Sequence, residues 1–350
     1  MLERRQTASN TLGDISVLYL TVMQRALTSR GVDPAPLFAQ FGIDEQLLSA
    51  PDARISIPRF MRLGQSAITL SGDPCLGLWM GDHTRPADLG LAGLAGATAA
   101  TGEAAMRTLI RFALLASYNS RGQPTFVAEQ SRACFYSIRP YNVFNFFVVD
   151  SVLAAWVRYL RDITGEQRVA KRVDIEYPEP AHSEQFRTWF DCPVRFGAER
   201  NQLVLRPEVL ALPSALAQPA VHTQLREICE AKLRRIHAGW SITEKVRDAL
   251  ARMLSGQTPQ LDAVAKQLGL TPWNLQRQLA ARNSSFTQLL DETRQSLAAI
   301  YLRETSLSLS EIAWVLGFAN ASAFQKAYKR WHGISPGQHR EAMKLQHSGS

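Results

Sequence analysis

The sequence predicts an α+β N-terminal domain followed by an all-α C-terminal domain, in which a long helix joins two helix-turn-helix units. Three observations support this fold class. The pattern Ala-x-x-x-Gly occurs twice near the C-terminus, from Ala265 to Gly269 and again 48 residues later from Ala313 to Gly317. Strand-like and helical patterns are mixed between residues 117 and 205, whereas helical patterns dominate elsewhere. Net positive charge is concentrated in the last third of the chain.

The composition is that of a folded protein with two or three domains, because 46% of its 350 residues are hydrophobic. No apolar run approaches the roughly 18 residues of a membrane span, and no signal-peptide pattern follows the N-terminus. The four cysteines lie far apart and form no C-x-x-C pair, so neither a zinc site nor a disulfide framework is indicated. We therefore expect a cytoplasmic protein with no membrane contact, no metal and no cofactor.

The charge is unevenly distributed between the two halves of the chain. Residues 1–221 carry 22 Lys/Arg and 21 Asp/Glu, whereas residues 222–350 carry 17 and 10. A basic module attached to a nearly neutral one favours a polyanionic partner for the second half. The alternative is an ordinary basic surface with no such partner.

The first part of the N-terminal domain, residues 10–116, is predicted to be helical. One helix is expected at 15–27, a second after Pro34 that ends at Gly42, and a third at 57–70. An Ala- and Leu-rich stretch at 89–116 contains three glycines spaced every three residues from Gly90. These glycines favour close helix packing over a phosphate-binding loop, because no strand precedes them and no Lys-Ser/Thr pair follows.

The second part of this domain, residues 117–215, is predicted to be mixed α/β. Alternating patterns around Ser131 and Arg132 indicate a hairpin. A helix is expected at 141–160, a strand at 172–177, a short helix at 184–190, and further strands at 194–196 and 201–205. The effector-sensing and dimerisation domain would thus span residues 1–215.

A linker helix is predicted within residues 216–240. It carries an apolar stripe with basic flanks, comprising Leu225, Ile228, Cys229, Leu233 and Ile236. The stripe has two interpretations, contact with a second chain or docking on its own domain. We expect the contact with a second chain.

The C-terminal domain, residues 241–345, opens with a capping box in which Ser241 is the N-cap and Glu244 the third helical residue. Thr258-Pro259 is predicted to start the next helix, which runs to Leu268. A turn at Gly269 leads into a second helix over residues 272–281, which starts at Thr271-Pro272.

This second helix has the features of a recognition helix. Leu275 and Leu279 are expected to point inward, with polar and aromatic residues on the other side. Arginine donates bidentately to guanine, glutamine pairs with adenine, and an aromatic ring contacts the thymine methyl. The alternative is a solvated face with one partly buried tryptophan. The residues expected to contact DNA are Thr271, Trp273, Asn274, Gln276 and Arg277.

A long helix is predicted from 286 to 305, with an apolar stripe that includes Leu289, Leu297 and Tyr301. Twenty residues at about 1.5 Å each span about 30 Å. Successive major grooves on one side of B-DNA recur every ~34 Å. A connector of this length suits two recognition helices that lie one helical turn of DNA apart.

The second unit has its own capping box at Ser308 and Glu311, and Asn320 is the expected N-cap of its recognition helix over 321–331. Phe324 and Tyr328 are predicted to point inward. The outward residues suit phosphate contacts more than base contacts, because lysine and arginine position the protein on the backbone. The expected DNA-contacting residues are Asn320, Ser322, Gln325, Lys326, Lys329 and Arg330.

Residues 242–340 resemble the AraC/XylS family of bacterial transcription regulators. The most specific motifs are Ile312-Ala-Trp-Val-Leu-Gly-Phe, Phe324-Gln-Lys-Ala-Tyr-Lys-Arg and Gly333-Ile-Ser-Pro. The resemblance implies recognition helices in adjacent major grooves. Two positions depart from the family pattern. Asn283 replaces a usual glycine and tolerates the same backbone, whereas Lys326 replaces a frequent arginine and weakens bidentate guanine contact.

The N-terminal half resembles the arabinose-binding-like domain of one branch of this family, that of ornithine-utilisation and virulence regulators. The resemblance rests on Gly31-Val-Asp-Pro, Pro51-Asp-Ala-Arg-Ile, Gly72-Asp-Pro, Leu89-Gly-Leu and Pro193-Val-Arg-Phe-Gly. It implies effector sensing and dimerisation, not catalysis.

A ligand site in this half is suggested by a mixture of aromatic and amide side chains, which often lines small-molecule pockets. The same mixture also occurs on ordinary helix surfaces. A catalytic triad of Asp150, His182 and Ser183 is rejected, because scattered residues allow it on paper and no nucleophile motif supports it. The candidate ligand residues are Tyr118, Asn119, Tyr141, Asn142 and Asn145.

Together these features predict a sequence-specific transcription regulator, not an enzyme. Its expected partners are double-stranded promoter DNA, a second copy of the chain, RNA polymerase if it is an activator, and a small-molecule effector. One alternative is a small-molecule-binding protein or enzyme with a basic regulatory C-terminal module. Another is a regulator without an effector, controlled by abundance or by partner proteins.

Overall fold

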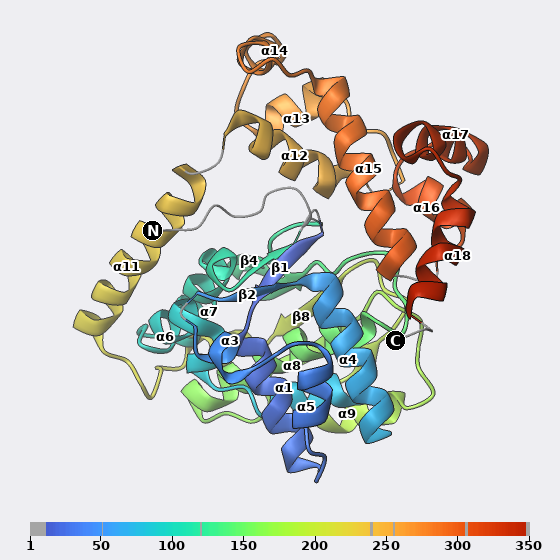
Figure 1. Ribbon diagram of the computed structural model, residues 1–350. Helices are drawn as coiled ribbons and strands as arrows, with labels where there is room; N and C mark the ends of the chain where they lie inside the picture. Colours follow the sequence, from blue (N-terminus) through green and yellow to red (C-terminus); the bar gives the residue numbers. More distant parts are fainter. Residues whose placement is uncertain are drawn as a thin grey trace. The chain divides into compact units, whose positions relative to one another are not determined.

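The computed structural model describes residues 12–50, 52–119, 121–238, 241–254, 256–304 and 307–347. The chain forms two compact units, one of residues Asp14–Ile236 and one that begins at His237 (Figure 1). Among the described residues, no helix combines the length and the apolar character needed to cross a membrane.

The N-terminal unit mixes helices with short strands throughout. Its strands are β1 (Gly13–Ser16), β2 (Arg54–Ser56), β3 (Ser117–Asn119), β4 (Thr125–Val127), β5 (Arg132–Phe135), β6 (Ala170–Asp174), β7 (Val194–Arg195) and β8 (Asn201–Leu205). Its α-helices are α1 (Leu18–Ser29), α2 (Ala35–Gln40), α3 (Glu45–Ser49), α4 (Ile57–Ser71), α5 (Leu76–Asp82), α6 (Gly90–Ala97), α7 (Gly102–Arg111), α8 (Phe146–Thr164), α9 (Ser183–Phe190), α10 (Pro207–Ala211) and α11 (Pro219–Ala238). Short 3₁₀ turns lie at Pro86–Leu89, Ala113–Leu115 and Ala128–Gln130.

The strands form a three-stranded sheet in the order β2-β1-β3 and a five-stranded sheet in the order β4-β5-β8-β6-β7. The predicted hairpin is confirmed, since β4 and β5 pair antiparallel with Val127 opposite Arg132. Within the larger sheet, β6 and β7 run parallel, whereas the other paired strands run antiparallel. Helix α8 crosses the core of this unit, and its Leu153, Val157 and Leu160 are fully buried.

The prediction that residues 10–116 are helical is wrong at two places. Residues 13–16 form β1 and residues 54–56 form β2, and the two strands pair with Ile15 opposite Ile55. Both strands are short, and each depends on a partner about forty residues away. The local apolar pattern that continues into α1 therefore concealed the strand.

The helix predicted at 141–160 begins at Phe146 instead. Two asparagines hold the preceding residues in a turn. Asn145 accepts a hydrogen bond from the backbone N–H of Asn142 at 2.8 Å and donates to the carbonyl oxygens of Ile138 and Pro140, each at 3.0 Å. Side-chain bonds of this kind compete with helix formation, which delays the start of α8.

The glycines of α6 pack closely against their neighbours, as predicted. A Cβ atom at Gly93 would lie 2.1 Å from the carbonyl oxygen of Pro86, and one at Gly96 would lie 2.4 Å from the Tyr159 hydroxyl. That hydroxyl donates to the carbonyl oxygen of Gly93 at 3.0 Å. The glycines therefore let α6 approach α8.

Helix α11 docks on its own unit. Cys229 belongs to the buried core, and Leu225 and Leu233 pack against it. Ion pairs also hold α11 against the rest of this unit. Arg111 pairs with Glu230 at 2.7 Å, and Lys232 pairs with Asp52 at 2.7 Å. The apolar stripe expected to contact a second chain is thus largely used within the chain.

The C-terminal unit is helical throughout its described residues. Its helices are α12 (Ile242–Met253), α13 (Leu261–Gln267), α14 (Pro272–Ala280), α15 (Phe286–Glu304), α16 (Leu309–Val315), α17 (Ala321–His332) and α18 (Pro336–His347). Both predicted capping boxes are formed, at Ser241 with Glu244 and at Ser308 with Glu311. The predicted end of the long helix at residue 305 lies outside the described residues.

Two helix-turn-helix units are present, α13–α14 and α16–α17. Gly269 and Gly317 turn the chain in each unit with φ of 67° and 68°, a conformation that glycine adopts without steric cost. Asn283 also lies in the left-handed region, with φ of 52°, as its tolerance for that conformation predicts. Helix α13 starts two residues later than predicted, at Leu261, because the Thr258 hydroxyl is engaged elsewhere in the unit.

Candidate nucleic-acid interface

The first candidate recognition helix, α14, has one buried and one exposed face. Leu275 and Leu279 are buried, as predicted, while Trp273 is 65% exposed and Gln276 and Arg277 are also exposed. A tryptophan left this open in a small helical unit has no packing role, so the alternative of a partly buried core tryptophan does not apply.

The exposed side chains of α14 are organised by contacts with one another. The Arg277 guanidinium lies over the Trp273 ring, 4.8 Å from its centroid, and donates to Asn274 Oδ1 at 3.3 Å. Thr271 caps the helix, since its hydroxyl accepts from the Asn274 N–H at 3.3 Å. Stacking limits the rotamers of Arg277, so this side chain has less conformational entropy to lose on binding a ligand than an unstacked arginine would have.

The second candidate recognition helix, α17, is also divided between two faces. Phe324 and Tyr328 are fully buried, as predicted. Asn320 caps the helix by accepting from the Ala323 N–H at 2.8 Å. The outward residues are all exposed: Ser322, Gln325, Lys326, Lys329 and Arg330.

Arg330 differs from the other outward residues of α17 because it has a partner within the unit. Its guanidinium pairs with Asp291 of α15 at 3.0 Å, although both side chains remain substantially exposed. Neither α14 nor α17 contains an Asp or Glu, so no acidic side chain of these helices opposes a polyanion. Lys326 and Lys329 show no ion pair with any residue that the structure describes, so they supply unpaired positive charge on this face.

An aromatic cluster holds α17 in place. Phe324 contacts Phe318, with ring centroids 5.7 Å apart, and Tyr328 stacks on His332 at 4.4 Å. The Tyr328 hydroxyl lies 2.7 Å from Nδ1 of His339 on α18. The second unit is thus supported by aromatic packing where the first uses leucines.

A junction centred on Arg294 joins the two helix-turn-helix units. From the middle of α15, Arg294 Nε donates to the Leu316 carbonyl oxygen and Nη2 donates to that of Gly317, both at 2.9 Å. Nη2 also donates to the Thr258 hydroxyl at 2.9 Å, and that hydroxyl donates to Gly317 at 2.8 Å. The guanidinium lies over Phe318, 4.7 Å from the ring centroid.

The junction connects the segment before α13 to the C-terminal end of α16. A Cβ atom at Gly317 would lie 2.9 Å from the Gln257 backbone, so this glycine also permits a close approach. Helix α15 lies between α14 and the α16–α17 pair (Figure 1). Within the C-terminal unit, Arg294 therefore helps to fix the position of one helix-turn-helix relative to the other.

The sequence does not predict this junction, because Thr258-Pro259 has the pattern of a helix start and Arg294 belongs to no motif. A signal was present, because Arg294 follows Leu290 by four residues and precedes Leu297 by three, which places a charge on the edge of an apolar stripe.

The candidate ligand residues in the N-terminal unit lie in different places. Asn119 lines a cavity, whereas Asn142 and Asn145 form the turn before α8. Tyr118 is half-buried on β3. The described residues that line the cavity are Ile15, Tyr19, Ile57, Phe60, Met61, Ser117, Asn119, Phe135, Ser137, Ile138, Val148, Ser151 and Val152.

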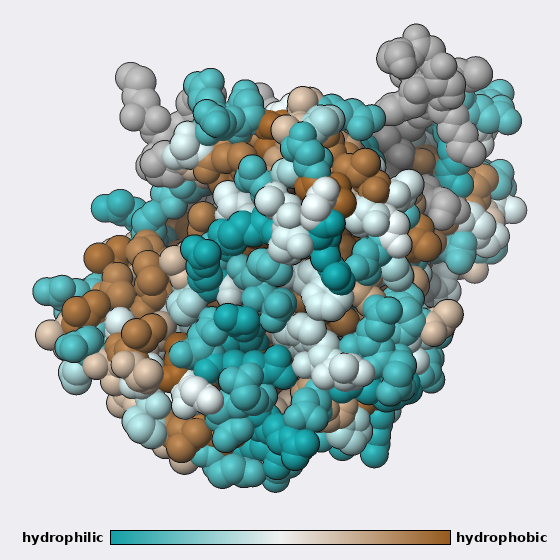
Figure 2. All heavy atoms as spheres, turned by 90° about the horizontal axis from the view of Figure 1, so that it is seen from below, coloured by the Kyte–Doolittle hydropathy of each residue, from teal (hydrophilic) through white to brown (hydrophobic). Residues whose placement is uncertain are grey.

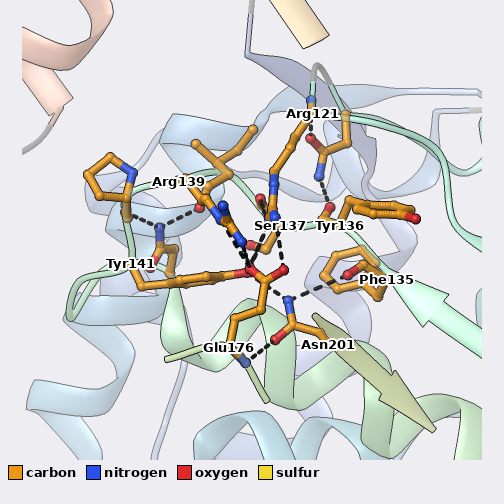
Figure 3. A network of polar contacts seen from close by, with 12 residues as sticks. Arg121, Phe135, Tyr136, Ser137, Arg139, Tyr141, Glu176 and Asn201 are labelled. Carbon is orange, nitrogen blue, oxygen red and sulfur yellow. Dashed lines mark hydrogen bonds and ion pairs between the residues drawn. The ribbon is translucent and has the colours of Figure 1, made fainter. Parts of the chain in front are cut away.

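Tyr141 belongs to a polar network around Glu176 (Figure 3). The Glu176 carboxylate accepts from both terminal nitrogens of Arg121 at 2.8 Å and from the Tyr141 hydroxyl at 2.6 Å, and Arg139 lies 3.1 Å away. Burial by itself raises the pKa of Glu176, but the hydrogen bonds from Arg121 and Tyr141 outweigh it and lower the pKa. With one carboxylate and two guanidinium groups, the network keeps one net positive charge.

The fold and these faces define a DNA-binding protein with two helix-turn-helix units. The family model for the arabinose-binding domain of AraC transcription regulators matches residues 31–214, and a helix-turn-helix domain model matches residues 264–342. The chain belongs to the AraC family and is a transcription regulator, not an enzyme.

Relatives are similar over nearly the whole chain. The ornithine utilization regulator of Pseudomonas aeruginosa is 29% identical over 343 residues, covering 97% of this chain and 99% of its own length. The regulator VirS of Mycobacterium tuberculosis is 25% identical and covers 89% and 91%. The crystal structure of the regulator CdpR from Pseudomonas aeruginosa is 21% identical, covers 93% and 98%, and has a TM-score of 0.44.

Proposed function

We propose that α14 and α17 of one chain enter two successive major grooves on the same side of DNA. The observation that carries this proposal is that the exposed faces of both helices contain no Asp or Glu. In addition, the Arg294 junction joins the two parts of the C-terminal unit to which these helices belong. The nineteen-residue α15 is about 28 Å long at ~1.5 Å per residue, near the ~34 Å between successive grooves.

The two helices have different roles in this proposal. Helix α14 reads bases through Trp273, Gln276 and Arg277, with Thr271 and Asn274 as supporting contacts. Helix α17 contributes mainly affinity, because Lys326 and Lys329 suit phosphates and its small polar residues carry little base information. Asn320, Ser322, Gln325 and Arg330 complete its contact face.

The N-terminal unit is proposed to form a homodimer. Apolar side chains are exposed on α6, on α11 and between α10 and α11, and Figure 2 shows hydrophobic side chains gathered at one edge of this unit. Leu94 is 39% exposed, Leu216 51%, Val221 42% and Ile228 46%. The Nδ1 atom of His222 lies 2.7 Å from the Ala95 carbonyl oxygen, which brings the start of α11 beside α6. Apolar patches of this kind are typical of homodimer contacts.

The same unit is proposed to bind a small effector in its cavity, in the cytoplasm where the DNA is found. Because the ornithine utilization regulator is among the relatives, any test of this cavity has to include L-ornithine as one of its probes. RNA polymerase becomes a partner if the regulator is an activator. A regulator without an effector, controlled by abundance, is the alternative.

Genome-wide mapping of bound sites with the full-length protein tests the DNA-binding proposal. The bound sites should share a motif that spans two major grooves, and a mobility shift with purified protein should select that motif over scrambled DNA. Retention that is equal on all sequences, or absent at low salt, contradicts it. Such a result would favour a small-molecule-binding protein with a merely basic C-terminal module.

A further inference from the structure

The cavity of the N-terminal unit lies between its smaller sheet and three helices. Its walls come from β1 and β3 of the three-stranded sheet, from α1 and α4, and from α8, which contributes Val148, Ser151 and Val152. The Tyr19 and Phe60 rings meet in one wall, with centroids 6.4 Å apart. The lining is thus assembled from elements spread over more than 130 residues of sequence.

The lining contains no charged side chain among the described residues. The surface it presents is almost entirely apolar, apart from a few hydroxyl groups and one amide. From the physical character of this lining, we propose that the cavity binds a small, neutral, predominantly apolar molecule with one hydrogen-bonding end. This inference rests on the proposed effector role of the unit and names the chemical class of the effector.

The dimensions of the cavity restrict the shape of the occupant. About 40 Å³ is open to the centre of a water-sized molecule, and the cavity with its open mouth holds about 490 Å³. One water needs about 10–15 Å³ of such space, and an engineered cavity that encloses benzene has about 150 Å³. The inner recess therefore admits the narrow end of an alkyl chain rather than a whole ring, and the remainder of the molecule lies in the mouth.

The polar groups of the lining suit a single hydroxyl or carbonyl. Within the described residues, the Ser151 hydroxyl donates to the Val148 carbonyl oxygen at 3.0 Å, whereas the hydroxyls of Tyr19, Ser117 and Ser137 make no hydrogen bond. The Asn119 amide is occupied, because its nitrogen donates to the Tyr136 carbonyl oxygen and its oxygen accepts from the Arg121 N–H at 2.9 Å. Hydroxyl groups both donate and accept, so either kind of neutral polar end finds a partner.

Two arginines that interact with lining residues, Arg54 and Arg121, are already paired. Arg54, whose charge acts on Tyr19, pairs with Asp14 and donates to the Leu115 carbonyl oxygen at 2.8 Å. Arg121 is bound by Glu176. A charged ligand group would therefore lose its hydration without gaining a counter-charge, which is strongly unfavourable.

A matched series of ligands on the full-length protein, without DNA, tests the proposal by isothermal titration calorimetry. The probes are 1-hexanol, hexanoate and hexylammonium, which share one alkyl chain and differ in the charge of the head group, together with L-ornithine. We expect saturable binding of 1-hexanol, with hexanoate and hexylammonium weaker by about tenfold or more and L-ornithine without effect. Equal binding of the three hexyl compounds, or binding of L-ornithine alone, overturns the proposal.

Variants locate the binding. Val152→Phe places a ring in the cavity and should abolish 1-hexanol binding, and the milder Val152→Leu should weaken it. The control is Leu225→Phe, an equally half-buried position on α11 outside the cavity, which should bind as the wild type does. Circular dichroism checks that each variant is folded. Binding that survives in folded Val152→Phe and Val152→Leu contradicts the assignment to this cavity.

These experiments distinguish a failure of the ligand proposal from a failure of the DNA-binding proposal. Titration without DNA reports only on the cavity, and a mobility shift without 1-hexanol reports only on the recognition helices. Loss of DNA recognition with intact, neutral-selective 1-hexanol binding would refute the DNA proposal alone. The reverse result would refute the ligand class alone.

Discussion

The Nη2 atom of Arg294, in the middle of α15, lies 2.9 Å from the carbonyl oxygen of Gly317, the glycine that turns the chain into the second recognition helix. The same guanidinium nitrogen donates to Thr258, in the segment that leads into the first unit. One side chain of the connecting helix therefore contacts the second helix-turn-helix unit and the segment that leads into the first. We expect this arrangement to give the two DNA-binding elements a preferred spacing.

Replacing Arg294 should weaken recognition of the whole operator without abolishing the fold. Arg294→Ala removes the donor to the Leu316 carbonyl group and one of the two donors to that of Gly317, at a cost of about 1–3 kcal/mol. We expect at least about tenfold weaker binding and reduced discrimination against an operator with one base pair inserted between the two contacted grooves. Mobility shifts on the two operators measure both effects.

The matched control is Arg247→Ala, which removes an equal charge from a single ion pair with Glu292 of α15, outside the junction. It should change operator affinity far less, because exposed pairs contribute little. If both variants behave alike, the junction does not set the spacing.

Arg277 is expected to determine sequence choice. Arg277→Ala should cost ~1–3 kcal/mol at one base pair and relax specificity there. Arg277→Lys keeps the charge but loses the planar fork that stacks on Trp273, so it should preserve non-specific affinity and still lose selectivity. Binding to an operator library with every base at each position tests this. An unchanged preference in both variants would show that Arg277 does not read a base.

Lys329 is expected to contact phosphate. Lys329→Ala should weaken binding to all sequences by a similar factor and reduce the slope of log K against log salt by about 1. The control is Lys232→Ala, which removes the same charge from the N-terminal unit, where it pairs with Asp52. A sequence-dependent loss in Lys329→Ala would instead indicate base contact.

Asp150 should make the stability of the N-terminal unit depend on pH. Burial raises the pKa of this carboxyl to about 8, and a hydrogen bond from the Tyr177 hydroxyl only partly offsets it. The folded protein retains a proton that the unfolded chain releases above its usual pKa of about 4. Stability therefore falls as pH rises from about 4 to 8.

Asp150→Asn cannot ionise and keeps an acceptor for Tyr177. Its advantage over the wild type should be small at pH 4.5 and reach a few kcal/mol near pH 8. Cys75 and Tyr177 do not titrate in this window, because burial raises the pKa of Cys75 to about 12 and that of Tyr177 well above its usual value. Differential scanning calorimetry at several pH values measures the difference. A constant difference across the range would contradict the assignment.

The exposed apolar face of α11 should carry the dimer contact. Ile228→Glu places a charge at a half-exposed position that makes no contribution to the buried stripe of Leu225, Cys229 and Leu233. We expect a dissociation constant at least about tenfold higher by sedimentation equilibrium. Leu70→Glu, at a similarly exposed leucine on α4, is the control and should leave the association unchanged. Equal behaviour of the two variants would place the dimer elsewhere.

The sequence alone was sufficient for the parts of the fold that depend on nearby residues. Helical periodicity separated Leu275 and Leu279 from Trp273 and Arg277, and the caps at Ser241 and Ser308 need only residues within one turn. The glycine turns required only a positive φ, which is a local property. The fold class and the DNA-binding assignment followed from these local signals.

Tertiary structure decided the features that join distant residues. Thr258 has a pattern typical of a helix start, yet its hydroxyl bonds Arg294, 36 residues away. The apolar stripe of α11 did not indicate which surface it would cover. The cavity walls, too, come from strands and helices that are far apart in sequence. Local patterns specify which face of an element is apolar, but the partner of that face depends on how the whole chain packs.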